Sequence, residues 1–119
     1  MSTNTLVVLC TCPSTSAKTL AEAVIHHHVA ACVNILPGIT SVYRWQGVVE
    51  SAEEQLLVIK TTDSCYAALE AVLTSLHPYQ VPEIIAFPVF KGLPRYLHWV
   101  LESTQDCILA NGIEQTSGG

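Results

Sequence analysis

Apolar residues recur along the chain in two rhythms, one typical of strands and one typical of helices. Residues 5–11, TLVVLCT, are β-branched and apolar at successive positions, which predicts a central strand covered on both faces. Pro13 stops this strand, and apolar residues then recur at the helical period from about residue 15 to residue 29. The chain therefore opens with a strand followed by an amphipathic helix.

Residues 31–62 have a different pattern, with two β-rich arms on either side of Gln46-Gly47. Glycine can take the positive φ that a two-residue hairpin turn needs. The middle of the second arm, ESAEEQ, is polar. We therefore expect a long ribbon whose base packs in the core and whose distal half projects beyond it. A turn at Gln46-Gly47 pairs Trp45 with Val48, Tyr43 with Glu50 and Ile35 with Val58.

Pro37-Gly38 interrupts the first arm of this ribbon. Because proline cannot donate a hydrogen bond to a neighbouring strand, the arm should be an edge strand or contain a bulge. An isolated two-stranded hairpin is marginally stable in water, so the projecting half should lie on a neighbouring subunit.

The rest of the chain adds a helix over about 63–76, a strand in IIAFPVF at 84–90, and a third helix that begins near Pro94. The order β-α-β-β-α-β with an appended helix predicts an α+β, ferredoxin-like fold with an antiparallel sheet. The usual strand order for this arrangement is 4-1-3-2, which places strand 1 antiparallel to strand 4. We expect one domain over residues 1–119, with its core at about 5–104 and a frayed tail at about 111–119.

Charge is scarce in this chain, and its balance excludes one class of partner. Only 13% of the residues are charged, about half the usual share of roughly 25% for a soluble domain. Apolar surface should therefore be covered by another subunit, which predicts an oligomer. The net charge of -5, with five Lys and Arg, argues against a nucleic-acid partner.

The five cysteines indicate a cellular compartment rather than a disulfide framework. An odd number of cysteines in an apolar chain that begins without a signal-peptide pattern is typical of buried, reduced thiols. No apolar run approaches the roughly 20 residues that span a bilayer, so we expect no membrane partner. These features predict a cytoplasmic protein.

One corner of the predicted sheet collects possible metal ligands. Cys10 and Cys12 lie at the end of strand 1, beside the start of strand 4 at Glu83, and His77 lies a few residues earlier. A thiol, an imidazole and a carboxylate suit copper or zinc better than magnesium. The alternative is a buried, inert cysteine beside a stiff Pro-containing turn, and the spacing alone favours that structural turn.

A second possible site takes an anion. Lys60 lies where a strand meets the start of a helix, and the aromatic and basic residues Tyr43, Arg44 and Trp45 lie beside the hairpin turn. The alternative for these residues is ordinary helix capping and packing at a subunit interface. No feature of the sequence selects a cysteine and a histidine as a catalytic pair, so we do not expect an enzyme.

Three separated motifs resemble the CutA family of divalent-cation tolerance proteins. They are AACVNILPGITSVYRWQGVVE, LLVIKTT and LHPYQVPEIIAFPV followed by GLPRYLHWV, and the resemblance covers about residues 5–104. It implies a ferredoxin-like fold assembled as a homotrimer, in which the long hairpin and the edge strands join neighbouring sheets.

The resemblance also implies a role in tolerance of copper and other divalent metals, without a required cofactor. A copper site proposed in the family corresponds here to Cys10, His77 and Glu83. Many members have Glu where this chain has Gln80, and an amide is an uncharged, poorer ligand. The competing hypothesis is a signalling or scaffold trimer that binds a small anion or a partner protein in clefts between subunits, using Tyr43, Arg44, Trp45 and Lys60.

Overall fold

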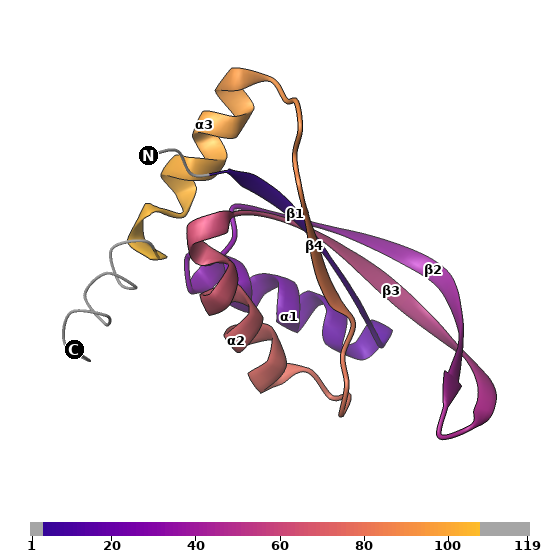
Figure 1. Ribbon diagram of the computed structural model, residues 1–119. Helices are drawn as coiled ribbons and strands as arrows, with labels where there is room; N and C mark the ends of the chain where they lie inside the picture. Colours follow the sequence, from indigo (N-terminus) through magenta and orange to yellow (C-terminus); the bar gives the residue numbers. More distant parts are fainter. Residues whose placement is uncertain (1–3, 108–119) are drawn as a thin grey trace.

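The computed structural model describes residues 4–107, and the predicted tail at 111–119 lies outside the described residues. Its elements follow the predicted order (Figure 1). They are β1 (Thr5–Cys12), α1 (Ser14–His26), β2 (Cys32–Trp45), β3 (Val48–Thr62), the 3-10 turn η1 (Asp63–Cys65), α2 (Tyr66–Leu76), β4 (Ile84–Pro88) and α3 (Pro94–Ser103).

The four strands form one antiparallel sheet in the order β2-β3-β1-β4, which confirms the predicted fold class and strand order. β1 pairs with β3 on one side and with β4 on the other. Cys10 lies opposite Ile84, so the end of β1 meets the start of β4 as predicted.

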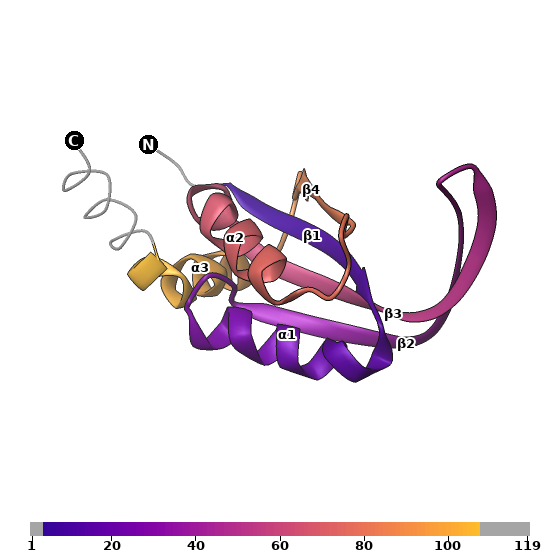
Figure 2. The same cartoon turned by 90° about the horizontal axis from the view of Figure 1, so that it is seen from below.

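The hydrophobic core lies between one face of the sheet and the helices α1 and α2, which lie side by side (Figures 1 and 2). Side chains alternate between the two faces of a strand, and Val8 and Cys10 of β1 point to this face together with Leu57 and Ile59 of β3. The helices contribute apolar residues at helical spacing: Leu20, Val24, Leu69 and Leu73.

α1 ends three residues earlier than its apolar pattern predicts. His28 has a φ of 61°, in the left-handed region, and its N–H donates to the Ile25 carbonyl at 3.0 Å. The Val29 N–H donates to the Val24 carbonyl at 3.1 Å. This pair of hydrogen bonds is a Schellman termination, and it turns Val29 back into the core although the helix has ended.

The β2-β3 ribbon has the predicted turn, with Trp45 paired to Val48. Gln46 and Gly47 have φ of 50° and 83°, as a type I′ turn requires. The predicted bulge is also present: two residues, Pro37 and Gly38, lie opposite one residue of β3.

The bulge shifts the register of the ribbon's base by one residue. Ile35 consequently pairs with Leu57. The prediction that Ile35 pairs with Val58 was wrong because it counted from the turn without the extra residue.

The distal half of the ribbon extends beyond the rest of the sheet, as predicted. β1 pairs with β3 only from Gln55 onward, so residues 48–54 of β3 and residues 39–45 of β2 have no third strand beside them. Figure 2 shows this part curling away from the plane of the sheet. The curl makes one side of the ribbon concave.

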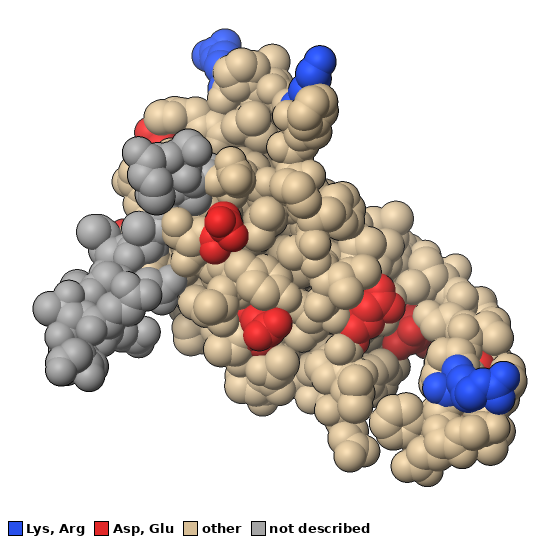
Figure 3. Space-filling view, viewed as in Figure 1, with Lys and Arg blue, Asp and Glu red and all other residues tan. Residues whose placement is uncertain are grey.

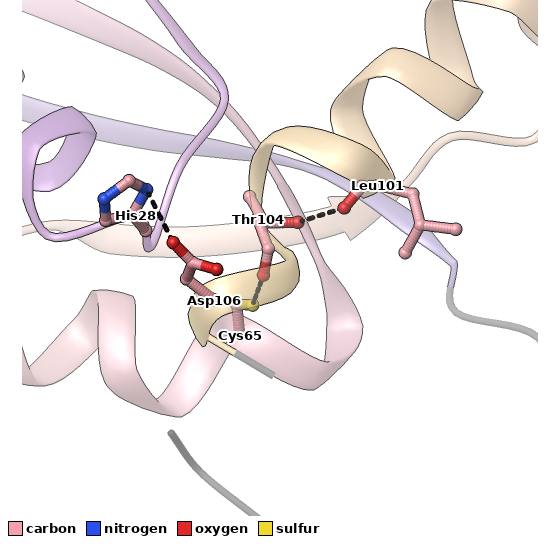
Figure 4. Close-up of polar contacts among 5 residues, drawn as sticks. All are labelled: His28, Cys65, Leu101, Thr104 and Asp106. Atoms are coloured by element: carbon pink, nitrogen blue, oxygen red, sulfur yellow. Dashed lines mark hydrogen bonds and ion pairs between the residues drawn. The ribbon is translucent and has the colours of Figure 1, made fainter. Parts of the chain in front are cut away.

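Two residues after α3, Thr104 and Asp106, contact η1 and the turn that follows α1 (Figure 4). The buried Cys65 thiol donates to the Thr104 carbonyl at 3.4 Å, and the Thr104 hydroxyl donates to the Leu101 carbonyl at 3.2 Å. His28 Nδ1 lies 3.8 Å from an Asp106 carboxylate oxygen at the surface. None of the helices in the described range is long and apolar enough to cross a membrane.

The second face of the sheet has no helical layer except near α3, which packs against β1 and β3. This face carries apolar side chains from several strands, including Leu9 of β1 and Leu56 of β3. Ile85 and Phe87 of β4 are 52% and 47% exposed. The sequence predicts a central strand that is covered on both faces. In this chain, helices cover one face of the sheet completely and the other face only near α3.

Candidate functional site

A cleft of about 670 Å³ lies between the concave side of the ribbon and the segment of residues 77–83, which connects α2 to β4. The strands contribute to its lining Thr11, Tyr43, Trp45, Glu50 and Glu54, and the segment contributes Tyr79, Gln80 and Glu83. Polar oxygen atoms and aromatic rings thus share one surface.

His77 fixes the start of the segment. Its Nε2 lies 2.8 Å from the Thr11 carbonyl oxygen, and its Nδ1 lies 3.2 Å from the Tyr79 backbone nitrogen. A carbonyl only accepts and a backbone N–H only donates, so Nε2 carries the ring proton and Nδ1 is the acceptor. The His77 and Tyr79 rings also pack with their centroids 4.8 Å apart. The buried histidine is a structural tie between β1 and the segment.

Tyr79 joins the segment to the ribbon. Its hydroxyl donates to Glu54 Oε2 at 2.6 Å, a short, charge-assisted hydrogen bond. Burial is the main cause that raises the pKa of Tyr79, and the hydrogen bond to the Glu54 carboxylate raises it further. The phenol therefore stays protonated and remains a donor.

Glu54 is 6% exposed, and in the described chain no Lys, Arg or His forms an ion pair with it. The ion pairs among residues 4–107 join His28 to Asp106 and His98 to Glu102, and neither involves Glu54. Within that range Tyr79 is its hydrogen-bond donor, at one carboxylate oxygen only. Burying a carboxylate without a counter-ion is costly, so this charge favours a cation beside it.

The whole cleft has the same sign of charge. Glu50, Glu54 and Glu83 line it, while none of the lining residues in the described chain is Lys, Arg or His. On the face of the molecule that Figure 3 shows, Lys and Arg side chains lie at the top and at the right-hand end, with acidic side chains between them. Clefts lined by one sign of charge concentrate the opposite ion.

Cys10 is fully buried on the helix-covered face of the sheet. Burial raises the pKa of its thiol from 9.0 to about 12, and the nearby Cys12, Glu83 and Glu54 add to the shift. The pKa of Cys12 is raised by burial and by Glu54. Because the thiolate is the form that binds metals, a metal ion at Cys10 would have to displace this proton.

The predicted trio lies at one corner of the sheet but is not arranged as three ligands. Cys10 is fully buried in the core beneath the helices, and both His77 nitrogens are engaged by backbone groups. Glu83 accepts a 3.5 Å hydrogen bond from the exposed Thr11 hydroxyl and lines the cleft. Among residues 4–107, no three His, Cys, Asp or Glu side chains are grouped so that they could hold one metal ion. The trio therefore stays a prediction, and only Glu83 keeps free oxygen atoms for a cation.

Within one chain, the residues of the predicted anion site lie in separate places. Tyr43 and Trp45 line the cleft, whereas the Arg44 guanidinium donates to the Gly47 carbonyl at 3.4 Å in the hairpin turn. Lys60 lies at the other end of β3, where its ammonium group donates to the Asn34 side-chain oxygen and lies 4.0 Å from Cys32 Sγ. Within one chain the two cations therefore lie apart from the aromatic residues of the cleft, and the anion site between subunits stays a prediction.

Sequence reasoning missed Glu50, Glu54 and Tyr79 as site residues. A signal was present in the polar run ESAEEQ, because Glu50 and Glu54 have the same parity on one strand and point to the same face. The curl that brings this face against Tyr79 depends on the tertiary structure.

The fold and the cleft define a small ferredoxin-like α+β protein with an acidic, aromatic-lined cleft beside a projecting ribbon. Residues 6–103 match the family described as "CutA1 divalent ion tolerance protein". The chain belongs to this family, which confirms the resemblance found in the sequence.

Individual relatives agree with this assignment. The chain is 50% identical over 99 residues to the divalent-cation tolerance protein CutA of Thermus thermophilus, covering 82% of this chain and 96% of that protein. It is 49% identical over 96 residues to the mouse protein CutA, covering 80% of this chain but only 54% of that longer protein. A solved structure of the Thermus thermophilus protein superposes with a TM-score of 0.82 at 48% identity, covering 84% of this chain and 98% of the other.

Proposed function

We propose that the protein binds a divalent cation without catalysing a reaction, and that the acidic cleft is the binding site. The observation that carries the proposal is Glu54, a residue only 6% exposed that lines the cleft and has, among residues 4–107, one hydrogen-bond donor and no ion-pair partner. A cation there would offset the cost of burying this charge.

The ligands offered by the cleft are oxygen atoms. Glu50, Glu54 and Glu83 contribute carboxylates, and Thr11 and Gln80 contribute neutral oxygen atoms. Because three acidic groups do not converge, one or two carboxylates would hold an ion that keeps part of its water shell. Copper is the first metal to test because of the resemblance, and manganese is a matched ion that prefers oxygen ligands.

The proposal includes a homotrimer in the cytoplasm. Its support is the sheet face without a helical layer, where Ile85 and Phe87 remain about half exposed, together with the low charge content of the chain. Cys10, Cys12, Cys32 and Cys65 form no disulfide bonds in the described chain, which suits a reducing compartment.

Calorimetric titration with copper(II) and with manganese(II) tests the site. The cleft variants are Glu54→Gln and Glu83→Gln, which keep the size and an acceptor oxygen but remove the charge. Cys10→Ser tests the competing trio, and Glu22→Gln removes an exposed charge on α1 as a matched control. We expect the two cleft variants to weaken binding at least about tenfold, since a charge-assisted contact contributes roughly 1.5–3 kcal/mol.

Cys10→Ser and Glu22→Gln should bind as the unmodified protein does. Loss of copper binding in Cys10→Ser, with Glu54→Gln unaffected, would transfer the site to Cys10, His77 and Glu83. Failure of both ions to bind the unmodified protein would end the proposal.

A further inference from the structure

The carboxylates of the cleft are spread along it rather than gathered at one point. Glu50 and Glu54 lie four residues apart on β3, which corresponds to roughly 13 Å along an extended strand. Glu83 approaches from the start of β4. No three acidic side chains in the described chain converge on one position. A row of separated negative charges matches a ligand with several separated positive charges better than it matches a single ion.

Aromatic rings line the same cleft as these charges. Tyr43 and Trp45 of the ribbon and Tyr79 of the opposite segment line the same cleft. An ammonium group is attracted to an aromatic face, and methylene groups gain by leaving water beside it. A hydrated metal ion makes little use of such walls.

The size of the cleft indicates a molecule rather than an atom. Its volume of about 670 Å³ falls within the range of roughly 300–1,000 Å³ typical of small-molecule sites. Glu54 adds a further observation, because the residue is only 6% exposed and lines the cleft, while its carboxylate oxygen without a donor among residues 4–107 is not a buried atom and is therefore accessible to a ligand.

From these features we infer that the cleft binds a linear aliphatic polyamine. Its ammonium groups bind Glu50, Glu54 and Glu83, and its methylene segments lie against the rings of Tyr43, Trp45 and Tyr79. The inference shares with the proposed function only the claim that the cleft attracts cations, because the ligand class is different. Polyamines and divalent metals would compete for the same carboxylates.

Trp45 provides a reporter inside the cleft. In a Trp99→Phe background it is the remaining tryptophan, so its fluorescence can be followed as spermidine is added. We expect a saturable change, with affinity that falls as salt is added because the attraction is between charges. n-Butylamine, which carries one ammonium group, should bind at least about tenfold more weakly.

Variants then assign the contacts. Glu50→Gln and Glu54→Gln should each weaken spermidine binding at least about tenfold, since each removes a charged acceptor. Glu22→Gln is the control of equal charge change and should leave the affinity unchanged. Manganese(II) is titrated in parallel on the same variants, so that the metal and the polyamine are judged separately.

Each remaining outcome overturns the inference. If manganese(II) binds and spermidine does not, the cleft is a metal site and the polyamine assignment is wrong while the proposed function stands. If Glu22→Gln weakens spermidine as much as Glu54→Gln does, the effect is only that of net charge. If spermidine does not bind and Glu54→Gln dissociates the oligomer in sedimentation, the cleft is a subunit contact.

Discussion

Leu57 and Leu56 are neighbours on β3, and their side chains point to opposite faces of the sheet. Leu57 is fully buried against α1 and α2, whereas Leu56 lies on the face without a helical layer and is only partly buried. The same strands thus supply one face that the chain covers itself and one face that it leaves open.

The two faces of the sheet should serve different purposes, with the covered face stabilising the fold and the open face contacting partners and ligands. The covered face contains the buried cysteines and aliphatic residues of the core, and its packing is complete within one chain. The open face carries both the exposed apolar residues of β4 and, farther along the ribbon, the acidic cleft. Partners and ligands should therefore act on the open face, with little direct contact to the core.

The largest expected effect comes from truncating Leu57. Leu57→Ala should lower the free energy of unfolding by about 3 kcal/mol, because a fully buried leucine loses its contacts and leaves a cavity. Leu56→Ala should cost about 1 kcal/mol or less in the dissociated chain, since that residue is not enclosed. Chemical denaturation of both variants at low and high protein concentration provides the measurement.

The concentration series sharpens the contrast. A cost for Leu56→Ala that appears only at high protein concentration would show that another copy covers the open face. Equal costs at every concentration would remove the distinction between the two faces.

The covered face could be predicted from sequence because its causes are local. Apolar spacing identified α1 and α2, and the turn at Gln46-Gly47 fixed the pairing of the distal ribbon. The bulge was predicted from Pro37-Gly38, but its effect on register was not carried through to Ile35. Such errors are small because each depends on a few neighbouring residues.

The cleft could be predicted only in part because its causes are distant in sequence. Strand order placed Cys10 near Glu83, but it could not reveal that Cys10 points to the covered face or that two backbone groups engage His77. The Tyr79–Glu54 contact depends on how the ribbon curls toward the segment. Proximity of ligand types was predictable, whereas the direction of their side chains was not.

Trp45 tests whether the open side of the ribbon contacts another copy. Its side chain is 37% exposed in the single chain, and a large aromatic residue at a subunit contact commonly contributes about 2 kcal/mol or more to association. Trp45→Ala should therefore raise the dissociation constant of the oligomer about 30-fold in sedimentation equilibrium. Trp45→Phe, which keeps an aromatic ring, should have a smaller effect. An oligomer unchanged by both substitutions would contradict this role for the ribbon.

The stability of the protein at alkaline pH tests how completely the covered face buries Cys10. Its pKa is raised from 9.0 to about 12 in the folded chain, chiefly by burial. Between these values the unfolded chain has lost a proton that the folded chain retains, so stability is fully present below pH 9 and falls as the pH rises toward 12. The slope from this single thiol is about 1.4 kcal/mol per pH unit. Cys10→Ala removes this contribution.

The comparison of slopes isolates the thiol from the packing change. Cys10→Ala loses some core contacts at every pH, which lowers the whole stability curve without changing its slope. Denaturant midpoints measured between pH 9 and 10.5 should therefore fall less steeply in the variant than in the unmodified protein. The raised pKa values of Cys12 and Tyr79 leave a residual slope in both. Parallel curves would mean that Cys10 is open to solvent, and the covered face would then be less completely sealed than its packing indicates.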